Sequence, residues 1–392
     1  MSEPLSTEHA EVLIVGAGPV GLTIALALGR AGVTTLVLEQ RRAVRETSRA
    51  IGITPASLEI LERYGVAAEM VEDGVQVRAA VIHGDQSEIA RAGFEGLPSD
   101  YRFILSLPQK RTEEMLVRAV GRQGSVRVLR GRRVTGISVE RSGVLVSADT
   151  EGGEEAYRGS VLCGCDGKHS TVRQLMGARW SGRRLSRSFA MADITDETGL
   201  GDTAHLYFTS TGSVESFPLP RGVRRWIVQT PGYVADPPAG LVQELVKRRS
   251  GIDLREGAEL WRSSFTTERR IATPWARPPI FLAGDAAHLM PPIGGQGMNV
   301  GLGDAEHLAD LLRSADRRAV NGAIEYERRR RRAFRTAARR SILGMSIGAA
   351  TGRAASRLRE LLIPVMLRGR REARVMAHFA MLASPNRRSP RR

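Results

Sequence analysis

Residues 11–39 constrain the fold more than any other part of the chain. A short apolar run, EVLIV, leads into the turn GAGPVG, a helical segment of small and aliphatic residues, and a second apolar run, TTLVLE. Apolar runs of this length are typical of strands that are buried in a parallel sheet. A strand, a helix and a strand within about 30 residues make one βαβ unit. The sequence therefore predicts an α/β protein with a parallel sheet.

The turn between the first strand and the helix has the pattern G-x-G-x-x-G, formed by Gly16, Gly18 and Gly21, with Pro19 opening the helix. The first glycine permits a tight turn, the second lets a pyrophosphate approach the backbone, and the third lets helix and strand pack closely. Phosphates then meet the free N–H groups and the positive dipole end of the helix. We expect these four residues to bind a dinucleotide.

Glu39 ends the second strand, 18 residues after Gly21. A carboxylate at this place accepts hydrogen bonds from ribose hydroxyls and repels a 2′-phosphate. Glu39 therefore favours an unphosphorylated adenosine, as in FAD or NAD, and the adjacent Gln40 is a further expected cofactor-binding residue. The chain has no second G-x-G-x-x-G motif, so a second dinucleotide would have no Rossmann domain of its own.

The net charge of +16 is concentrated near the C-terminus, where residues 321–392 contain 19 arginines and four glutamates. A basic footprint confined to one end, with few aromatic residues, is not that of a nucleic-acid-binding face, so we expect no nucleic-acid partner. The segment instead suits a carrier protein, an anionic membrane surface or a partner subunit, or is a solvated face around packed helices.

Features that would place the protein outside the cytoplasm do not occur in the sequence. No apolar run is long enough to span a bilayer, and the first residues, with Glu3, Glu8 and Glu11, lack the order of a signal peptide. Cys163 and Cys165 are too few for a disulfide framework, and we interpret them as two thiols at a strand end rather than zinc ligands. We expect a cytoplasmic protein without a metal site.

Four further motifs follow the first glycine turn: SRAIGIT at 48–54, LPQKRTEEML at 107–116, CDGKHSTVR at 165–173 and GDAAHLMPPIGGQGMN at 284–299. In this order they resemble the FAD-dependent aromatic hydroxylases, the single-component flavoprotein monooxygenases typified by p-hydroxybenzoate hydroxylase, which include bacterial polyketide hydroxylases. The resemblance covers residues 11–313.

The resemblance implies how the last motif serves FAD. Asp285 accepts hydrogen bonds from cofactor hydroxyls, Pro292 walls the flavin, and the helix beginning near Met298 directs N–H groups at the anionic reduced flavin. His288 is interpreted as a packing residue rather than an acid or base. The cofactor contacts implied by the motifs are Arg49, Gln109, Asp166, Arg173, Gly284, Asp285, Pro292, Gly295, Gly297, Met298 and Asn299.

The resemblance also implies a Rossmann-like FAD-binding domain with an inserted β-rich substrate domain and a helical C-terminal extension. The FAD-binding domain is expected at 1–76, 101–180 and 271–317, the substrate domain at 77–100 and 181–270, and the arginine-rich helices at 318–392, with a disordered tail.

In the implied reaction, NAD(P)H reduces FAD, O2 adds to give a flavin C4a-hydroperoxide, and one oxygen atom passes to an aromatic ring. Phe217, Leu219 and Ile227 are expected to face the substrate. Because they are apolar, they favour a hydrophobic, polycyclic phenol such as an aromatic polyketide. Tyr207, His205 and Arg224 are candidate catalytic residues. The alternative for Tyr207 and His205 is a packing role within the sheet, and the alternative for Arg224 is a surface position in a hairpin.

Two other functions fit the same motifs. One is a quinone-type ring hydroxylase or a Baeyer–Villiger oxygenase on the same scaffold. The other is a non-catalytic FAD-binding subunit that acts in assembly through its basic end.

Overall fold

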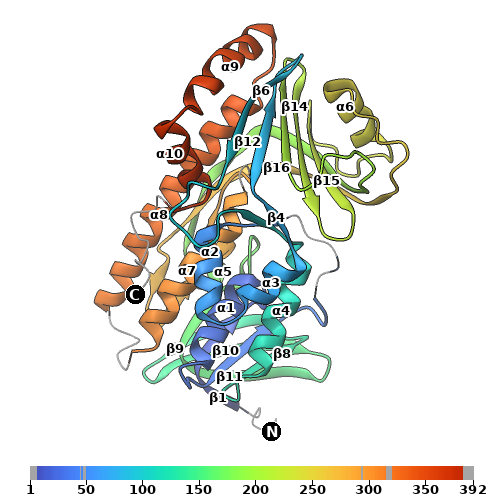
Figure 1. The fold of residues 1–392 in the computed structure, drawn as a ribbon. Helices are drawn as coiled ribbons and strands as arrows, with labels where there is room; N and C mark the ends of the chain where they lie inside the picture. The colour runs from blue at the N-terminus through green and yellow to red at the C-terminus, as the bar shows by residue number, and fades with distance from the viewer. Residues whose placement is uncertain (1–6, 45, 47–49, 293–294, 315–319, 383–392) are drawn as a thin grey trace.

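The computed structural model describes residues 7–44, 46, 50–292, 295–314 and 320–382. A parallel sheet with helices against it forms the lower part of the molecule in Figure 1, and a second sheet forms the upper part. The α/β class, the β-rich insertion and the helical C-terminal region expected from the sequence are confirmed.

The first sheet contains the predicted βαβ unit. β1 lies between β11 and β2, parallel to both, and β2 is parallel to β8. Val12, Leu13 and Ile14 have no exposed surface because both faces of the sheet are covered. In order, the strands are β17 (Ala276–Arg277), β18 (Ile280–Leu282), β11 (Gly153–Gly164), β1 (Thr7–Val15), β2 (Thr35–Glu39) and β8 (Val126–Arg130), and the hairpin of β9 (Arg133–Glu140) and β10 (Gly143–Thr150) extends from β11.

Helices α1 (Pro19–Gly29), α4 (Gln109–Gly121) and α7 (Gln296–Leu312) pack against one face of this sheet. Pro19 is the first residue of α1, a position that needs no N–H donor. Shorter helices complete this part: α2 (Pro55–Arg63), α3 (Ala67–Asp73), α5 (Thr171–Leu175) and the 3₁₀ turn η1 (Gly284–Ala286). A small sheet of β3 (Gly52–Ile53), β7 (Ile104–Ser106) and β4 (Val75–Val77) lies beside them.

The second sheet is antiparallel except where β13 runs parallel to β5. Helix α6 (Leu241–Ser250) covers one of its faces through Val242, Leu245 and Val246. The strand order is β19 (His288–Leu289), β16 (Glu259–Thr273), β12 (Arg179–Thr195), β15 (Val223–Thr230), β14 (Gly212–Leu219), β13 (Ala204–Thr209), β5 (Ala79–His83) and β6 (Glu88–Gly93).

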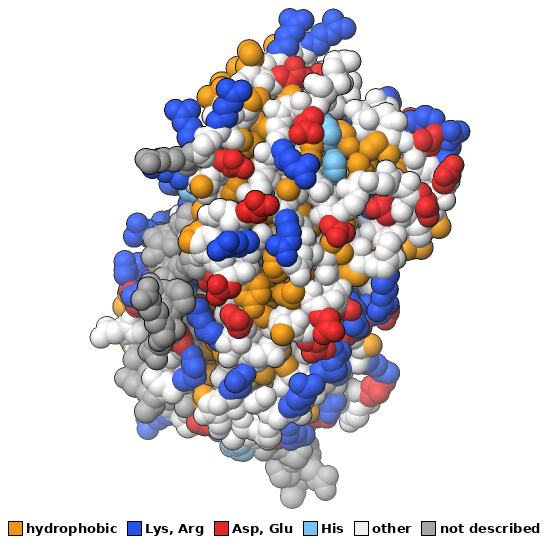
Figure 2. Space-filling view, in the orientation of Figure 1, with side chains coloured by type: hydrophobic (Ala, Val, Ile, Leu, Met, Phe, Trp, Pro, Cys, Tyr) orange, Lys and Arg blue, Asp and Glu red, His pale blue; other side chains and the backbone are white. Residues whose placement is uncertain are grey.

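The C-terminal helices are α8 (Val320–Gly348), α9 (Arg353–Met366) and α10 (Arg370–Phe379), which run along one side of both sheets (Figure 1). α8 buries one side through residues such as Phe334 and Ala338. α9 exposes apolar side chains at Leu358, Leu361 and Leu362. Figure 2 shows hydrophobic and basic side chains side by side at this end of the molecule. In the described part of the chain, no helix combines the length and apolar character needed to span a bilayer.

Candidate cofactor and substrate site

The glycine-rich turn joins β1 to α1 at the carboxyl end of the parallel sheet. Gly16 has a φ of +105°, and a Cβ there would lie 2.4 Å from the carbonyl oxygen of Cys165. A Cβ at Gly21 would lie 2.0 Å from the oxygen of Gly16, whereas at Gly18 it would meet no described atom within 4 Å. Gly16 and Gly21 are therefore required by the packing of the protein, and Gly18 leaves open backbone at the start of α1, where a pyrophosphate fits.

Glu39 is buried at the end of β2 and accepts hydrogen bonds from two sides. Its Oε2 accepts the N–H of Ala17 at 2.8 Å, and its Oε1 accepts the backbone N–H and Nε of Arg41 at 2.9 and 3.0 Å. Burial alone would raise the pKa of Glu39, but the hydrogen bonds from Arg41 and Ala17 outweigh it and lower the pKa. Glu39 is thus an anion that fixes the turn. Because Arg41 neutralises part of its charge, the exclusion of a 2′-phosphate is weaker than the sequence indicated. Gln40 is exposed beside it.

The Asp166 carboxylate organises the turn after β11. Its Oδ1 accepts a hydrogen bond from Ser170 Oγ at 2.5 Å, and its Oδ2 accepts the N–H of Val172 at 3.0 Å. Arg173 is 4% exposed, donates to the carbonyls of Ala286 and Lys168 at 3.1 and 2.9 Å, and stacks over Trp180. Arg173 is therefore not a solvated helix residue. Its guanidinium is occupied in joining two loops, which argues against a direct contact with a nucleotide.

The Gly284–Ala286 turn follows β18 and presents Asp285. Ala286 and Ala287 are fully buried, whereas Asp285 is solvent-accessible. Burial among surrounding protein atoms nevertheless raises the pKa of Asp285. A side chain that is open to water and yet partly desolvated lies in a concave space. This is the arrangement expected of a carboxylate that meets cofactor hydroxyls.

A buried charged network holds this turn from behind. His288 Nε2 lies 2.6 Å from Asp304 Oδ2, which also accepts the N–H of Gly284 at 3.0 Å. Arg330 Nε of α8 donates to Asp304 Oδ1 at 2.7 Å. His288 also packs against the rings of Trp275 and Phe334. These contacts leave His288 in a packing and positioning role. Asp304 and Arg330 were missed by the sequence analysis, since neither lies within a recognised motif.

Asn299 lies in the first turn of α7, and its amide is fully engaged with protein. Its Oδ1 accepts the N–H of Thr54 at 2.9 Å, and its Nδ2 donates to the carbonyls of Gly52 and Gly295 at 2.9 and 2.6 Å. The cofactor contact predicted for Asn299 is through the N–H groups that open α7, and it stays a prediction. The side chain ties α7 to β3, and any contribution of this turn to a flavin comes from its backbone.

The remaining predicted cofactor residues occupy three places. Gln109 begins α4, donates to Glu113 Oε1 at 2.7 Å and is tied to Ala50 by its N–H. Pro292 and Gly295 are exposed, Gly297 and Met298 are partly buried at the start of α7, and a Cβ at Gly297 would meet no described atom within 4 Å. Arg49 lies outside the described residues.

Three chain segments meet at the end of the parallel sheet. The Gly16 turn touches Cys165 and Asp166, and Gly284 and Gly301 both approach Val20 of α1. Gly295 faces Gly52, with a hypothetical Cβ 3.8 Å from its Cα. The structure thus brings the open backbone of Gly18, the Asp166 turn and the accessible Asp285 to one edge of the sheet.

The second sheet has two distinguishable faces. Val214, Trp226 and Val228 pack against α6, and we call theirs the outer face. Successive residues of a strand alternate between faces, so Phe217 and Leu219 of β14 and Ile227 of β15 lie on the opposite, inner face. Ile227 there packs with Met345 and Ala349 around the end of α8. α8 in turn donates a hydrogen bond from Ser341 Oγ to the Pro291 carbonyl, beside the predicted flavin loop.

The three catalytic candidates lie on the outer face. His205 is paired with Ser216, and Tyr207 with Val214, a member of the α6 cluster. His205 stacks with His83 and Tyr207, and burial together with His83 lowers its pKa to about 4. These side chains are therefore separated by the sheet from Phe217 and Ile227. A catalytic role for them is not supported, and sheet packing is.

Arg224 is likewise no catalytic residue, and it is not a surface residue either. It is 0% exposed, its Nε donates to Asp196 at 2.7 Å, and its other nitrogens donate to Ser216 and to the carbonyls of Thr203 and Gly201. Arg225 binds Asp193 through two nitrogens at 2.6 and 2.7 Å. Both arginines serve the fold, because a buried guanidinium must be paired.

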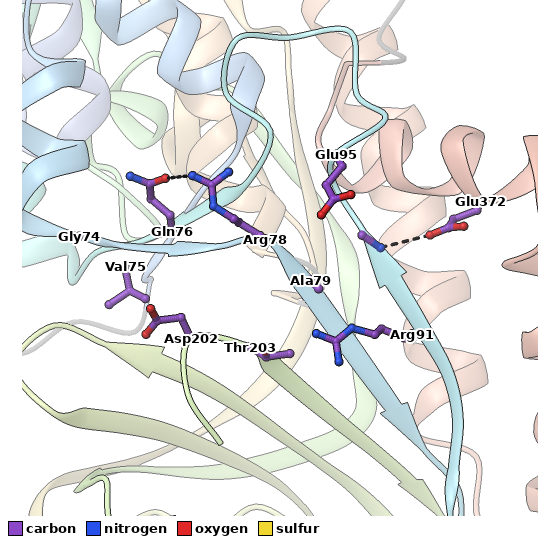
Figure 3. A pocket seen from close by; sticks show the side chains of 11 residues that line it. Gly74, Val75, Gln76, Arg78, Ala79, Arg91, Glu95, Asp202, Thr203 and Glu372 are labelled. Atoms are coloured by element: carbon purple, nitrogen blue, oxygen red, sulfur yellow. Dashed lines mark hydrogen bonds between the residues drawn. The ribbon is translucent and has the colours of Figure 1, made fainter. Parts of the chain in front are cut away.

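An open hollow of about 800 Å³ lies between β4, β5, β6, α10 and residues 202–203 (Figure 3). Gln76 accepts a hydrogen bond from Arg78 at its edge, and Glu372 accepts the N–H of Gly93. Its charged lining residues are Arg78, Arg91, Glu95, Asp202 and Glu372. Since it contains none of the predicted cofactor or substrate residues, it lies outside the candidate site.

Comparison with known proteins places this geometry in a family. A family model described as FAD binding domain matches residues 9–341. The rifampicin monooxygenase of Streptomyces venezuelae is 31% identical over 324 residues, which cover 80% of this chain and 66% of that protein. The 6-methylpretetramide 4-monooxygenase of Streptomyces rimosus is 32% identical over 340 residues, which cover 83% of this chain and 60% of that protein.

The crystal structure of p-nitrophenol 4-monooxygenase PnpA from Pseudomonas putida DLL-E4 matches with a TM-score of 0.87 and 24% identity, over 97% of this chain and 100% of that chain. At this identity the likeness shows the fold alone. The chain spans slightly less than two thirds of the length of both curated relatives.

Proposed function

The chain belongs to the FAD-dependent aromatic hydroxylase family, and from this membership we propose that it is an NAD(P)H- and O2-consuming monooxygenase. Its proposed substrate is an electron-rich, hydrophobic, polycyclic phenol of secondary metabolism. Relatives named for rifampicin and 6-methylpretetramide support this substrate class.

One observation carries the proposal: the open backbone at Gly18 and the accessible carboxylate of Asp285 converge at the end of the parallel sheet. Gly18 and the first turn of α1 would hold the pyrophosphate of FAD, and Glu39 and Asp285 would accept hydrogen bonds from its hydroxyls. The bound FAD would supply the chemistry of oxygen transfer.

The protein's own part in the reaction is to position the two reactants and exclude water. The backbone N–H groups that open α7 would stabilise negative charge on the reduced cofactor. Phe217, Leu219 and Ile227 would pack against the apolar ring of the substrate, on the face of the sheet turned towards α8. NADH or NADPH would bind transiently.

Incubation of the purified protein with a panel of phenols tests this function. We expect a visible flavin spectrum and faster NADPH or NADH oxidation with polycyclic phenols. With ¹⁸O2, mass spectrometry should detect one labelled oxygen atom on a ring carbon of the product. Ring expansion would indicate a Baeyer–Villiger oxygenase, and reaction with quinone precursors alone a quinone-type hydroxylase. Bound flavin without any acceleration would contradict the proposal and favour a non-catalytic subunit.

The partners of the C-terminal helices are a separate proposal. Exposed Leu358, Leu361 and Leu362 on α9 are side chains that a carrier protein or an anionic membrane surface would contact, which supports the prediction made from the arginine content.

A further inference from the structure

Glu215 is an acidic residue within the apolar inner face of the second sheet. It lies on β14, two residues from Phe217, and is paired with Leu206 of β13 and Ile227 of β15. Ile227 is in turn paired with Met191 of β12. The row across the sheet is therefore apolar on both sides of the carboxyl group. Since Val214 packs against α6, the Glu215 side chain points away from α6, to the same side as Phe217.

The Glu215 carboxyl group has no protein partner within the described part of the chain. No hydrogen bond or ion pair to it is formed there, and burial alone raises its pKa to about 7. Glu215 retains 8% of its surface, so it is not sealed from the space beside the sheet. A buried polar group without a partner costs free energy. Such groups are uncommon in folded proteins and are concentrated where a ligand supplies the missing partner.

The charged residues nearest on the same face are already paired with each other. Arg225, which is paired with Phe217 across the sheet, binds Asp193 at 2.6 and 2.7 Å and lies over the ring of Trp261. Met345, Gly348 and Ala349 at the end of α8 pack against this face, and none of them can titrate. Protein charges on this face therefore leave Glu215 without compensation.

We propose that Glu215 binds a hydroxyl group of the aromatic substrate and accepts its proton during hydroxylation. This inference rests on the proposed function and narrows its substrate class. The substrate has an apolar ring body, which lies against Phe217, Leu219 and Ile227, and a phenolic hydroxyl directed at the sheet. A substrate without a hydroxyl at that position leaves the carboxylate unpaired.

The proton balance assigns Glu215 one step. The phenolic O–H bond breaks, the proton passes to the carboxylate, and the electron pair moves into the ring while a ring carbon forms its bond to oxygen. Loss of the hydrogen from that carbon as a proton restores the aromatic ring. Overall, substrate, O2, NAD(P)H and one proton give hydroxylated product, water and NAD(P)⁺. Proton transfer by a positioned carboxylate contributes about 10²–10⁴-fold in rate.

Matched ligands separate this role from simple packing. 1-Naphthol and 1-methoxynaphthalene differ in the hydroxyl hydrogen, and their binding to the FAD-loaded protein is measured from the flavin visible spectrum without NAD(P)H. We expect the wild type to prefer 1-naphthol by about 10- to 100-fold, the value of a hydrogen bond to a charged group. Glu215→Ala should bind the two ligands equally. Glu244→Gln, on the exposed side of α6, should behave as wild type.

The pH profile supplies a second measurement. In the wild type, kcat/KM for an accepted phenol should fall as the pH decreases through about 7, because the protonated carboxyl cannot accept a proton. The nearly isosteric Glu215→Gln variant should lose this acidic limb and about 10²–10⁴-fold of kcat.

Three outcomes would overturn the assignment of Glu215. In the first, the wild type binds 1-naphthol and 1-methoxynaphthalene equally, or binds neither of them. In the second, Glu215→Ala still prefers 1-naphthol. In the third, kcat/KM of Glu215→Gln still falls at acidic pH as in the wild type. If the wild type hydroxylates a phenol but any of these occurs, only the role of Glu215 is wrong. If no phenol accelerates NAD(P)H oxidation, the proposed function fails with it.

Discussion

His288 and Asp304 form a hydrogen bond of 2.6 Å in the protein interior, directly behind the turn that presents Asp285. The same carboxylate accepts the N–H of Gly284 and binds Arg330 of α8. The position of Asp285 therefore depends on a charge network whose members never reach the cofactor space.

Asp304→Asn should destabilise the protein and weaken FAD binding together. The substitution leaves the Arg330 guanidinium, which is 5% exposed, without its counter-ion. Removing one partner of a buried ion pair costs about 3–5 kcal/mol. Urea denaturation and FAD titration measure the two effects. Asp310→Asn, on the same helix and paired with Arg313 nearer the surface, is the control and should change both by little. Normal stability of Asp304→Asn would mean that the network does not hold the turn.

Gly18→Ala should weaken FAD binding, whereas Gly16→Ala should lower the stability of the fold. A Cβ at Gly18 meets open space, so the apo-protein should keep its thermal stability while the affinity for FAD falls about 10- to 100-fold. At Gly16, φ is +105° and the Cβ would lie 2.4 Å from Cys165 O, so folding itself should lose about 1–3 kcal/mol. Differential scanning calorimetry of the apo-proteins and flavin titration distinguish the two. Tight FAD binding by Gly18→Ala would contradict the proposed pyrophosphate contact.

His205→Ala and Tyr207→Phe should leave catalysis nearly unchanged. Both side chains lie on the α6 side of the sheet, away from Phe217 and Ile227. We expect kcat and KM within about twofold of the wild type, because no catalytic proton transfer, worth about 10²–10⁴-fold, is removed. Steady-state kinetics with an accepted phenol measures this. A hundredfold loss of kcat, with the variant still folded and yellow, would return these residues to the list of catalytic candidates.

The cofactor motifs were readable in the sequence because their geometry is local. A glycine turn between an apolar run and a helix determines its own backbone shape, and Gly16 and Gly18 stand where the pattern predicts. Hydrogen bonds between residues far apart in the chain could not be predicted in this way. Asn299 binds Gly52 across 247 positions, and Arg224 binds Asp196 across 28. Charged residues are usually exposed, so the sequence placed Arg224 on the surface.

Strand alternation predicts which side chains share a face of the second sheet. It places His205 and Tyr207 on one face of their strand, and Phe217 and Leu219 on one face of theirs, but a period of two does not tell which face is turned inwards. That depends on where α6 and α8 pack. Glu215 was missed for the same reason. The sequence does show an acidic residue at the same alternation as Phe217 and Leu219. This position predicts a substrate contact only when the face that these residues share is known to be the inner one.

Glu215→Gln should stabilise the protein at alkaline pH and have little effect at acidic pH. Burial raises the pKa of Glu215 from 4.5 to about 7 in the folded protein. A raised carboxyl pKa favours folding below the unfolded value and loses this contribution as the pH rises through the folded value. At about 1.4 kcal/mol per pKa unit, the wild type should lose on the order of 3 kcal/mol between pH 4.5 and pH 8 through this group. Glutamine does not titrate, so the difference in Tm between variant and wild type should grow across that interval. Thermal unfolding at pH 5, 6, 7 and 8, with Glu244→Gln as control, measures it. A difference independent of pH would show that the Glu215 carboxyl titrates normally.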